Sequence, residues 1–491
     1  MYSSTRSSQD QVSAKEAILQ GLASDGGLFV MPELAECKVD LEKIASLDFK
    51  NIAKLVYSKL LDDFSESEIE DCIKSAYSDS FENDEIAPIT RVGNHYIMEL
   101  WHGPTSAFKD VALTMLPHLL SKSLEKTGKK ALILTATSGD TGKAAMSGFA
   151  DVKNTGICVY YPHGGVSPIQ EKQMSSQIGK NVDVFAIEGN FDDAQRGVKE
   201  LFVDEELKQY AAEKNIVLSS ANSINIGRLI PQIIYYFSSY ADLVKNNEIK
   251  CGDTITYTVP TGNFGDVLAG YYAYVMGLPA KFVVAANKNN VLDDFIKSGT
   301  YDRNREFFKT ISPSMDILVS SNLERLLYYI TDCNCNKVSG WMQELNNFGK
   351  YEIDKESKKA LHSIFSSGMT DENDTMKTIK HVFDAYNYVL DTHSAVAYNV
   401  ADNSNIVGAS IVLSTASPYK FPQAVMEALG RSMTDEWEAL EELGKLDSNP
   451  CPKPLAGLKE LPVLHDNVVE QSEMKMSVKR AIDRLAGNES G

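Results

Sequence analysis

The sequence lacks the marks of a membrane-anchored or secreted chain. No apolar run approaches the roughly 20 residues that span a bilayer, and no apolar segment of signal-peptide length stands at the start. The GxGxxG fingerprint, the GxxxxGK[ST] phosphate loop and the HExxH motif are also missing. We therefore expect a cytoplasmic protein, and the absences remove the usual support for a nucleotide-binding enzyme or a zinc hydrolase.

Cysteine is scarce and scattered. The chain has 7 cysteines, an odd number, and none of them forms a CxxC pair. Only Cys333 and Cys335 lie close together, without the second pair or the histidines that a zinc site requires. We expect free, reduced thiols and no metal site.

Positive charge is in deficit. Lys and Arg total 48 against 67 Asp and Glu, so the net charge is −19 and the isoelectric point is near 5.0. This balance argues against nucleic acid or an anionic membrane surface as the main partner. If the substrate is anionic, a few basic side chains and helix N-termini must concentrate positive potential at the site.

The length and composition that are present suit several globular domains. The chain of 491 residues is too long for one hydrophobic core. Its 43% hydrophobic and 23% charged residues are ordinary for globular proteins. The patterns predict a mainly helical N-terminal domain (1–92), an α/β core (93–300) with a smaller subdomain at about 130–220, a helical insertion (301–375), and a return to the core with a C-terminal tail (376–491).

Short apolar runs alternate with helical segments between about 130 and 300. Strands are predicted at 131–135, 157–161, 182–188, 216–218, 254–259 and 281–286. Continuous apolar strands separated by helices indicate a parallel sheet covered on both faces. Ligands of such sheets bind beyond the C-terminal strand ends, so the loops there are the places to look for chemistry.

Helix signals dominate the rest of the chain. Ser13 and Glu16 form a capping-box pattern, and apolar residues follow helical spacing at 52–61 and 65–76. Beyond 300, the patterns predict helices at 302–308, 321–330, 339–348 and 374–390, a turn at 391–393, a strand at 411–413 and a closing helix that ends at Leu485.

One lysine stands in an unusual context. Lys109 lies between the apolar pair Ala107-Phe108 and a helical pattern that starts at Asp110. A lysine taken alone is most often a surface charge, because lysine is almost never fully buried without a partner. The apolar-flanked turn indicates instead a lysine with a specific task, and Asp110 is expected to cap the helix.

Two strand-to-helix loops have the composition of anion sites. In the loop 260–265 (PTGNFG), two glycines permit positive φ angles and close backbone approach, and the next helix offers free amides to a phosphate. The alternative is a tight turn that needs glycine for geometry alone. The loop 136–142 (ATSGDTG) is dense in hydroxyls and amides and precedes a helix, which suits a carboxylate or phosphate. A plain N-cap would explain only one of its polar residues.

Two further segments carry similar residues. The sequence GNF at 189–191 is followed by Asp192 and Asp193, which would repel an anion, so we predict a turn and a helix cap there. In the segment 219–228, Asn222, Ser223 and Arg228 would bracket the first turn and a half of a helix, where Arg can bind a second anion bidentately. The alternative is a capped helix whose Arg228 forms an ordinary surface ion pair.

A lysine on an apolar turn, a phosphate loop and a small-residue anion loop together indicate a pyridoxal phosphate site. Lys109 would form the Schiff base, the loop 260–265 would hold the cofactor phosphate, and the loop 136–142 would take the substrate carboxylate. Phe108 is expected to pack beside the cofactor.

A series of motifs spread over nearly the whole chain carries a family resemblance. In order they read YSSTR, GLASDGGLFV, WHGPTSAFKD, TATSGDTG, NSINIGR, VPTGNFGD, SNLERLL, DTHSAVA and STASPYKFP. With these motifs the chain resembles the threonine synthase family, in its longer form, within the tryptophan synthase β-like group of pyridoxal phosphate enzymes. The resemblance implies fold type II, with two parallel-sheet α/β subdomains and a helical N-terminal domain.

The resemblance also implies a reaction and a site. O-phospho-L-homoserine and water would become L-threonine and phosphate by γ-elimination and β-addition of water, in a monomer or homodimer. The implied residues are Lys109 for the Schiff base, Gly262, Asn263, Phe264 and Gly265 for the cofactor phosphate, Thr415 facing the pyridine nitrogen, Ser138 and Thr141 near the substrate carboxylate, and Asn222, Ser223 and Arg228 near the substrate phosphate.

Two departures and two alternatives accompany the resemblance. The chain reads ASPYKF at 416–421 where many relatives have THP or AHP followed by AKF, and Asp140 stands where the broader group often has Asn. Another pyridoxal phosphate enzyme, such as a β-eliminating dehydratase, could share Lys109 and the loop 260–265, but the segment 222–228 favours a phosphorylated substrate. A non-catalytic relative would be expected to lose Lys109 or the loop, and both are present.

Overall fold

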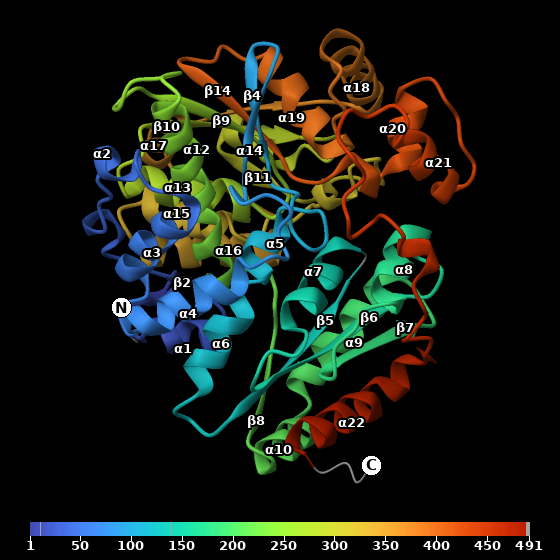
Figure 1. The fold of residues 1–491 in the computed structure, drawn as a ribbon. Coiled ribbons are helices and arrows are strands. Elements are labelled where there is room, and N and C mark those ends of the chain that lie inside the picture. The colour runs from blue at the N-terminus through green and yellow to red at the C-terminus, as the bar shows by residue number, and fades with distance from the viewer. Residues whose placement is uncertain (10, 138, 488–491) are drawn as a thin grey trace.

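Two sheets in separate lobes organise the chain (Figure 1). The structure is a computed structural model and describes residues 1–9, 11–137 and 139–487. The larger sheet has the order β13-β10-β9-β14-β4-β3, and all its neighbours are parallel except the hairpin β3-β4. Its strands are β3 (Ile89–Val92), β4 (His95–Glu99), β9 (Ile255–Pro260), β10 (Ala280–Ala286), β13 (Phe365–Met369) and β14 (Ala409–Ser414).

Buried helices cover both faces of the larger sheet. Tyr257 and Phe282 point into the core shared with α12 (Ile233–Lys245) and α13 (Gly265–Val275). Val283 and Val412 alternate to the other face, where α19 (Thr392–Asp402) packs. This alternation is what a strand buried on both faces produces. Further helices around this lobe are α14 (Val291–Ser298), α18 (Glu372–Tyr386), α20 (Pro422–Ala428) and α21 (Glu436–Leu443).

The smaller sheet is wholly parallel and has the order β15-β7-β6-β5-β8. Its strands are β5 (Lys130–Ala136), β6 (Thr155–Pro162), β7 (Val182–Ile187), β8 (Ile216–Ser219) and β15 (Val468–Val469). Its helices are α6 (Leu116–Leu124), α7 (Asp140–Phe149), α8 (Pro168–Ser175), α9 (Phe191–Val203), α10 (Glu205–Glu213) and α22 (Met474–Ala486). The C-terminal strand and helix thus join the smaller lobe, where α22 contacts β5 and β6.

The N-terminal segment packs as a helical layer against the larger lobe (Figure 1). It contains β1 (Ser3–Ser4), β2 (Phe29–Val30), α1 (Ala14–Gln20), α2 (Leu41–Ile44), α3 (Phe49–Leu60) and α4 (Glu66–Ala76). The predicted capping box is present, because Ser13 accepts from the Glu16 amide while Glu16 reaches back to the Ser13 amide. Helix α3 packs on α12, and α1 packs on α6.

Residues 301–375 hold strands as well as helices. The elements are β11 (Thr300–Asp302), α15 (Leu323–Ile330), α16 (Cys335–Phe348), β12 (Lys350–Glu352) and α17 (Lys355–Ile364), followed by β13. Because β13 pairs with β10, this segment adds the edge strand of the larger sheet and is more than a helical insertion. The boundaries at 92, 300 and 375 otherwise stay predictions.

Two local predictions were wrong. The helix predicted at 302–308 does not form, because side chains bind the backbone there instead: Asp302 accepts from the Asn304 amide, and Asn289 accepts from the Phe308 amide. The predicted turn at 391–393 is the start of α19, whose cap Asp391 accepts from the next amides. Helix α19 is buried almost all round and therefore has no amphipathic period to read.

In residues 1–9, 11–137 and 139–487, no helix is long and apolar enough to cross a membrane. Within the same ranges, no group of three or more His, Cys, Asp or Glu side chains could hold a metal ion.

Candidate active site

The candidate site lies where the C-terminal ends of both sheets meet. Strands β4, β9 and β14 are parallel neighbours, so the segments that follow them leave the larger sheet at one edge. These segments carry Lys109, the loop 261–265 and Thr415. In the smaller sheet, β5 and β8 are parallel neighbours and lead into 137–142 and 220–228. The topology therefore brings together loops that are far apart in the sequence.

Lys109 is held by a strained turn. It is the first residue of α5 (Lys109–Leu113) and is only 9% exposed. The Asp110 carboxylate accepts from the Thr105 amide at 2.8 Å and from the Thr105 hydroxyl at 2.5 Å. Ser106, between them, has a φ of 60° in the left-handed region. Asp110 thus fastens the turn in front of α5, and the Lys109 side chain points into the protein.

Opposing charges surround the Lys109 amine. Its Nζ lies 3.8 Å from Oδ2 of Asp140, the first residue of α7 in the smaller lobe. Burial, as the largest effect, and the cations Arg228 and Lys420 lower the pKa of Lys109 to about 8, although Asp140 acts to raise it. A lysine with this pKa is neutral for part of the time near physiological pH, which is what a nucleophile or proton carrier requires.

The backbone of the loop 262–265 differs from the prediction that its two glycines would adopt positive φ angles. Positive φ occurs at Phe264 (62°), not at Gly262 or Gly265. Gly262 is needed for space instead, because a Cβ there would lie 2.6 Å from the Ser314 carbonyl oxygen. A Cβ on Gly265 would meet only Asn322 Nδ2, at 3.5 Å.

The start of α13 leaves amides for a ligand. No side chain caps this helix in the part of the chain that the structure describes, and the first amides of any helix have no partner within it. Such amides, next to a glycine whose added Cβ would make a single ordinary contact, fit a phosphate group. The residues present therefore fit the phosphate of pyridoxal phosphate.

The segment 320–322 supports this loop from behind. Ser320 Oγ donates to the Gly262 carbonyl, Ser321 Oγ donates to Asn263 Oδ1, and the Asn322 amide donates to the Asn263 carbonyl. Asn322 also donates from Nδ2 to the carbonyl of Ser223, at 3.2 Å. One helix start thus supports both predicted phosphate-binding segments.

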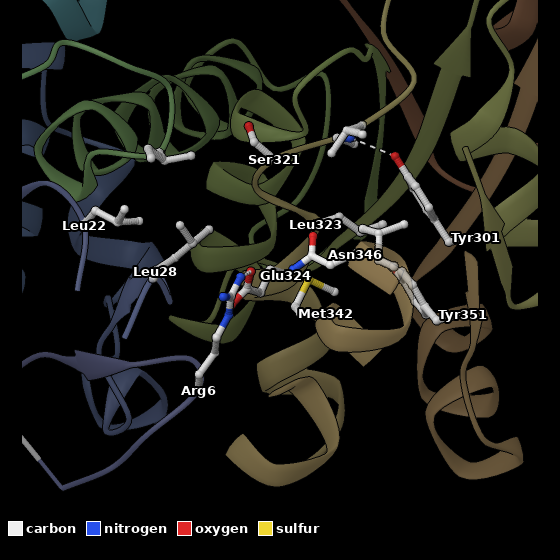
Figure 2. A pocket seen from close by; sticks show the side chains of 15 residues that line it. Arg6, Leu22, Leu28, Tyr301, Ser321, Leu323, Glu324, Met342, Asn346 and Tyr351 are labelled. Carbon is white, nitrogen blue, oxygen red and sulfur yellow. Dashed lines mark hydrogen bonds and ion pairs between the residues drawn. The ribbon is translucent and has the colours of Figure 1, made fainter. Parts of the chain in front are cut away.

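The first sequence motif reaches this support. Arg6 and Glu324 form a two-fold ion pair, with Nε–Oε1 at 2.9 Å and Nη2–Oε2 at 2.8 Å, and the Thr5 hydroxyl also donates to Glu324. Figure 2 shows the pair on the wall of a cavity of about 240 Å³, which Ser320 and Ser321 also line. The motifs YSSTR and SNLERLL therefore anchor the N-terminal layer to the supporting helix α15.

Thr415 is brought beside Lys109 by backbone pairing. The Phe108 amide donates to the Thr415 carbonyl at 2.8 Å, and the Ser417 amide donates to the Ser106 carbonyl at 3.0 Å. Thr415 is 6% exposed. It thus stands at the same edge as the loop 262–265, as its predicted role requires.

Thr137 shapes the loop of the smaller lobe. Its hydroxyl oxygen accepts from the amides of Gly139 and Gly142, both at 3.0 Å. Gly139 has a φ of 155°, which favours glycine. Thr141 is half-buried in the first turn of α7. The predicted residue Ser138 lies outside the described residues.

Arg228 is buried without a carboxylate. It lies in α11 (Ile226–Leu229), is 5% exposed, and donates from Nη1 to the Ala221 carbonyl at 3.0 Å. Among the described residues, no acidic side chain lies within ion-pair distance of it. Burial lowers its pKa to about 10. Since a buried cation needs an anion, the geometry suits an anionic ligand.

Asn222 and Ser223 lie in front of Arg228 but do not cap its helix. Asn225 is the cap, and its side chain accepts from the Gly227 amide. Asn222 is exposed, and Ser223 Oγ lies 3.3 Å from Ser321 Oγ. The helix is thus capped by Asn225, and Asn222 and Ser223 precede the cap.

Comparison with known proteins agrees with this geometry. Residues 1–77 match the family model described as threonine synthase N terminus, and residues 394–480 match threonine synthase, C-terminal. The threonine synthase of Saccharomyces cerevisiae is 37% identical, over 97% of this chain and 99% of its own. The chain belongs to the threonine synthase family. The human protein named threonine synthase-like 1 is 34% identical over 95% of this chain and 64% of its own length.

Solved structures of the family share the whole fold. The pyridoxal phosphate-bound threonine synthase from Brucella melitensis superposes with a TM-score of 0.88 at 35% identity, over 98% of this chain and 99% of that one. The yeast threonine synthase gives 0.87 at 35% identity over 99% of both chains. The predicted fold type II, with two parallel-sheet α/β subdomains, is confirmed.

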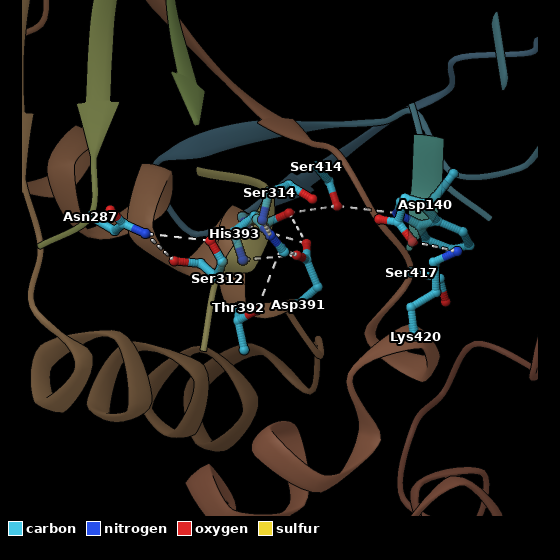
Figure 3. A network of polar contacts seen from close by, with 12 residues as sticks. Asp140, Asn287, Ser312, Ser314, Asp391, Thr392, His393, Ser414, Ser417 and Lys420 are labelled. Atoms are coloured by element: carbon cyan, nitrogen blue, oxygen red, sulfur yellow. Dashed lines mark hydrogen bonds and ion pairs between the residues drawn. The ribbon is translucent and has the colours of Figure 1, made fainter. Parts of the chain in front are cut away.

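The structure adds residues to the candidate site that the sequence patterns did not indicate. Lys420 contacts Asp140, and His393 binds both Asp391 Oδ1, at 2.9 Å, and the Ser314 amide, at 3.1 Å (Figure 3). His393 therefore holds Ser314, whose carbonyl oxygen lies close to Gly262. The motifs STASPYKFP and DTHSAVA contain these residues, but no spacing rule relates them to positions 140 or 262.

Proposed function

We propose that this chain is a pyridoxal phosphate-dependent threonine synthase that converts O-phospho-L-homoserine and water into L-threonine and phosphate. Membership of the family over nearly the full length supports the activity. The observation that carries the assignment of the site is Lys109, a buried amine with a pKa lowered to about 8 at the meeting point of both lobes.

The cofactor would be held by groups on the larger lobe. Lys109 forms the Schiff base with its aldehyde, the amides of 262–265 and of the α13 start hold its phosphate, and the Thr415 hydroxyl faces its ring nitrogen. When bound, the cofactor supplies an electron-withdrawing ring that acidifies the protons on the substrate carbons next to the amine. The Phe108 ring centroid is 5.7 Å from Lys109 Nζ. Phe108 would therefore pack beside the cofactor.

The substrate would be held by both lobes. Arg228, with Asn222 and Ser223, binds the phosphate that leaves, and Ser138 and Thr141 bind the carboxylate at the start of α7. Arg228 supports this assignment because it is buried and lacks a protein anion among the described residues. On a chain with a net charge of −19, such local cations draw an anionic substrate into the site.

Lys109 would also move protons. When its amine is not bonded to the cofactor, Lys109 would take the proton from the substrate α-carbon and would serve the neighbouring carbon in turn. Arg228 stabilises the charge that develops on the departing phosphate, an electrostatic contribution of the kind that is usually largest. A neutral hydroxyl at Thr415 leaves the ring nitrogen less charged than a carboxylate would.

The test combines absorption with product analysis. Purified protein with pyridoxal phosphate should show a visible Schiff-base band that Lys109→Ala abolishes. The control variant Lys143→Ala, which changes a half-buried lysine on the same helix as Asp140, should retain the band. The wild-type protein should release phosphate from O-phospho-L-homoserine and form threonine. Absence of the band in the wild type contradicts the cofactor assignment. A band together with deamination of L-threonine, without phosphate release, would favour the dehydratase.

A cytoplasmic location, a monomeric or homodimeric state and the absence of nucleic-acid partners remain predictions from the sequence. Size-exclusion chromatography with light scattering measures the oligomeric state directly.

A further inference from the structure

A second lysine is buried between the lobes. Lys420 ends the short 3₁₀ turn η4 (Pro418–Lys420) that follows β14, and it is 1% exposed. Its Nζ lies 2.9 Å from Asp140 Oδ1 and donates to the Thr105 carbonyl at 2.8 Å and to Gln173 Oε1 at 3.3 Å. Figure 3 shows the side chain reaching Asp140 across the gap between the two segments. One amine thus contacts the turn before Lys109 and two helices of the smaller lobe.

Asp140 is a buried carboxylate that requires a cation. It is 7% exposed, and leaving such a charge unpaired in the interior is strongly unfavourable. Two amines are in range: Lys420 at 2.9 Å from Oδ1 and Lys109 at 3.8 Å from Oδ2. Lys420 is the nearer of the two amines. Its own contacts are with Asp140, the Thr105 carbonyl and Gln173. Lys109 must be able to lose its proton, so it cannot be the lasting partner.

We propose that Lys420 is a positioning residue: it is the permanent counter-ion of Asp140, and it thereby allows Lys109 to become neutral inside the site. The inference rests on the proposed function for the task of Lys109. The charge arrangement itself involves only residues of this chain.

The signs of the effects follow from the charges that face these groups. Asp110, Arg228, Asp140 and Lys420 act on Lys109, and Lys109, Lys420 and His393 act on Asp140. Removal of Lys420 leaves Lys109 as the nearest cation for Asp140, so the proton on the Lys109 nitrogen is held more firmly. Removal of the Asp140 charge has the opposite effect. When both charges are removed, the two opposite effects on the pKa of Lys109 should nearly cancel.

The main experiment titrates the holoenzyme. The pH midpoint of the visible Schiff-base band is measured between pH 6 and 10 for Lys420→Met, Asp140→Asn and the double variant. Lys420→Met should raise the midpoint by at least about one pH unit, the usual size of such a charge effect, and Asp140→Asn should lower it. The double variant should return to within about half a unit of the wild type.

A second readout needs no cofactor. In the cofactor-free protein, acylation of Lys109 by an amine reagent is followed by peptide mass spectrometry over the same pH range, and its midpoint should shift in the same directions. A wild type without a visible band would contradict the proposed function, whereas this second readout would still decide the role of Lys420. If Lys420→Met does not fold, Asp140→Asn and the double variant give the decisive comparison.

Lys143→Met is the matched control. Lys143 is on the same helix as Asp140, donates to Gln177 Oε1 at 2.6 Å, and has no carboxylate within ion-pair distance among the described residues. Its removal should shift the Lys109 midpoint by much less than that of Lys420. Equal shifts, or unchanged midpoints in both Lys420→Met and Asp140→Asn with only a loss of thermal stability, would overturn the proposal and leave Lys420 as a structural tie.

Discussion

Lys109 shows how the surroundings of a side chain change its chemistry. Its ordinary pKa is 10.5, and burial together with two neighbouring cations brings it to about 8 despite the attraction of Asp140. At pH 7 the free amine is then present in roughly one molecule in ten, against fewer than one in a thousand for an ordinary lysine. A chemical role for this residue rests on that difference.

The lowered pKa of Lys109 predicts a specific pH dependence of stability. Below pH 8 the folded and unfolded chains both carry its proton, so the cost of the buried charge is fully present. Between about 8 and 10.5 the unfolded chain binds more protons, so the free energy of unfolding rises with pH. Without cofactor, Lys109→Met should therefore be more stable than the wild type at pH 7, by up to about 3 kcal/mol, and this advantage should vanish as the pH rises above 10.5. Urea unfolding at several pH values measures it, and a variant that is less stable at pH 7 contradicts the electrostatic account.

Arg228 should act on the phosphorylated substrate. Arg228→Gln removes a buried charge-assisted contact, so kcat/KM for O-phospho-L-homoserine should fall by about 10- to 100-fold. Arg228→Lys should recover part of the loss, because it keeps the charge but not the two-pronged geometry. Steady-state kinetics with the exposed Arg196→Gln variant as control provides the check. Equal kinetics in Arg228→Gln and Arg196→Gln would remove Arg228 from the phosphate site.

At the scale of elements, the loop between β9 and α13 depends on what lies behind it. The Ser314 carbonyl fills the space where Gly262 lacks a side chain, and His393 holds the Ser314 amide. At Gly265, the first residue of α13, an added Cβ would meet only Asn322 Nδ2, at an ordinary contact distance of 3.5 Å. Gly262 is therefore needed for close packing, whereas Gly265 leaves room for a ligand.

The two glycines predict opposite results for the same substitution. Gly262→Ala forces a methyl group against the Ser314 backbone. The substitution should lower the free energy of unfolding of the cofactor-free protein by about 1–3 kcal/mol. Gly265→Ala should change that stability by less than about 0.5 kcal/mol, yet weaken pyridoxal phosphate binding by roughly tenfold or more, because its methyl group occupies the cradle and displaces a charge-assisted contact. Urea unfolding and cofactor titration separate the two effects. Unchanged cofactor affinity in Gly265→Ala would place the phosphate elsewhere.

The elements themselves were predicted unevenly. Each strand predicted between 130 and 300 is present, because strands buried on both faces are continuous apolar runs with clear ends. Helix α19 was missed since its burial on nearly all sides hides the helical period, and β13 was missed since FSSGM is a weak strand sequence that pairs at the sheet edge. Both elements are decided by their neighbours.

In the whole molecule, the site belongs to neither lobe alone. The larger lobe supplies Lys109, the loop 262–265 and Thr415, and the smaller lobe supplies Asp140. Arg228 lies in α11, which follows β8 of the smaller sheet and packs against α5 and α13. Strand β15 and helix α22 return from the far end of the chain to the smaller lobe and so link the two. A ligand bound between the lobes should therefore stabilise the fold as a unit.

Cofactor binding should raise the thermal unfolding midpoint. A ligand at 100 times its dissociation constant adds about 2.7 kcal/mol, which for a chain of this size is a rise of roughly 2–3 °C. Scanning calorimetry with and without pyridoxal phosphate measures the shift. Lys109→Ala should show a clearly smaller rise, since only the non-covalent contacts remain. Equal rises in wild type and variant would argue against a bond to Lys109.

The sequence by itself determined the strands and pointed to the candidate anion loops, because these are local patterns of polarity and turn chemistry. The family resemblance of its motifs implied the individual residues proposed to bind the cofactor and substrate. Tertiary structure decided which of them meet. The pairing of Lys420 with Asp140, 280 positions apart by their residue numbers, depends on how two sheets are set against each other. The local pattern around Lys109 indicates a specific task, but its burial and lowered pKa come from the same arrangement, since both depend on distances that no spacing along the chain encodes.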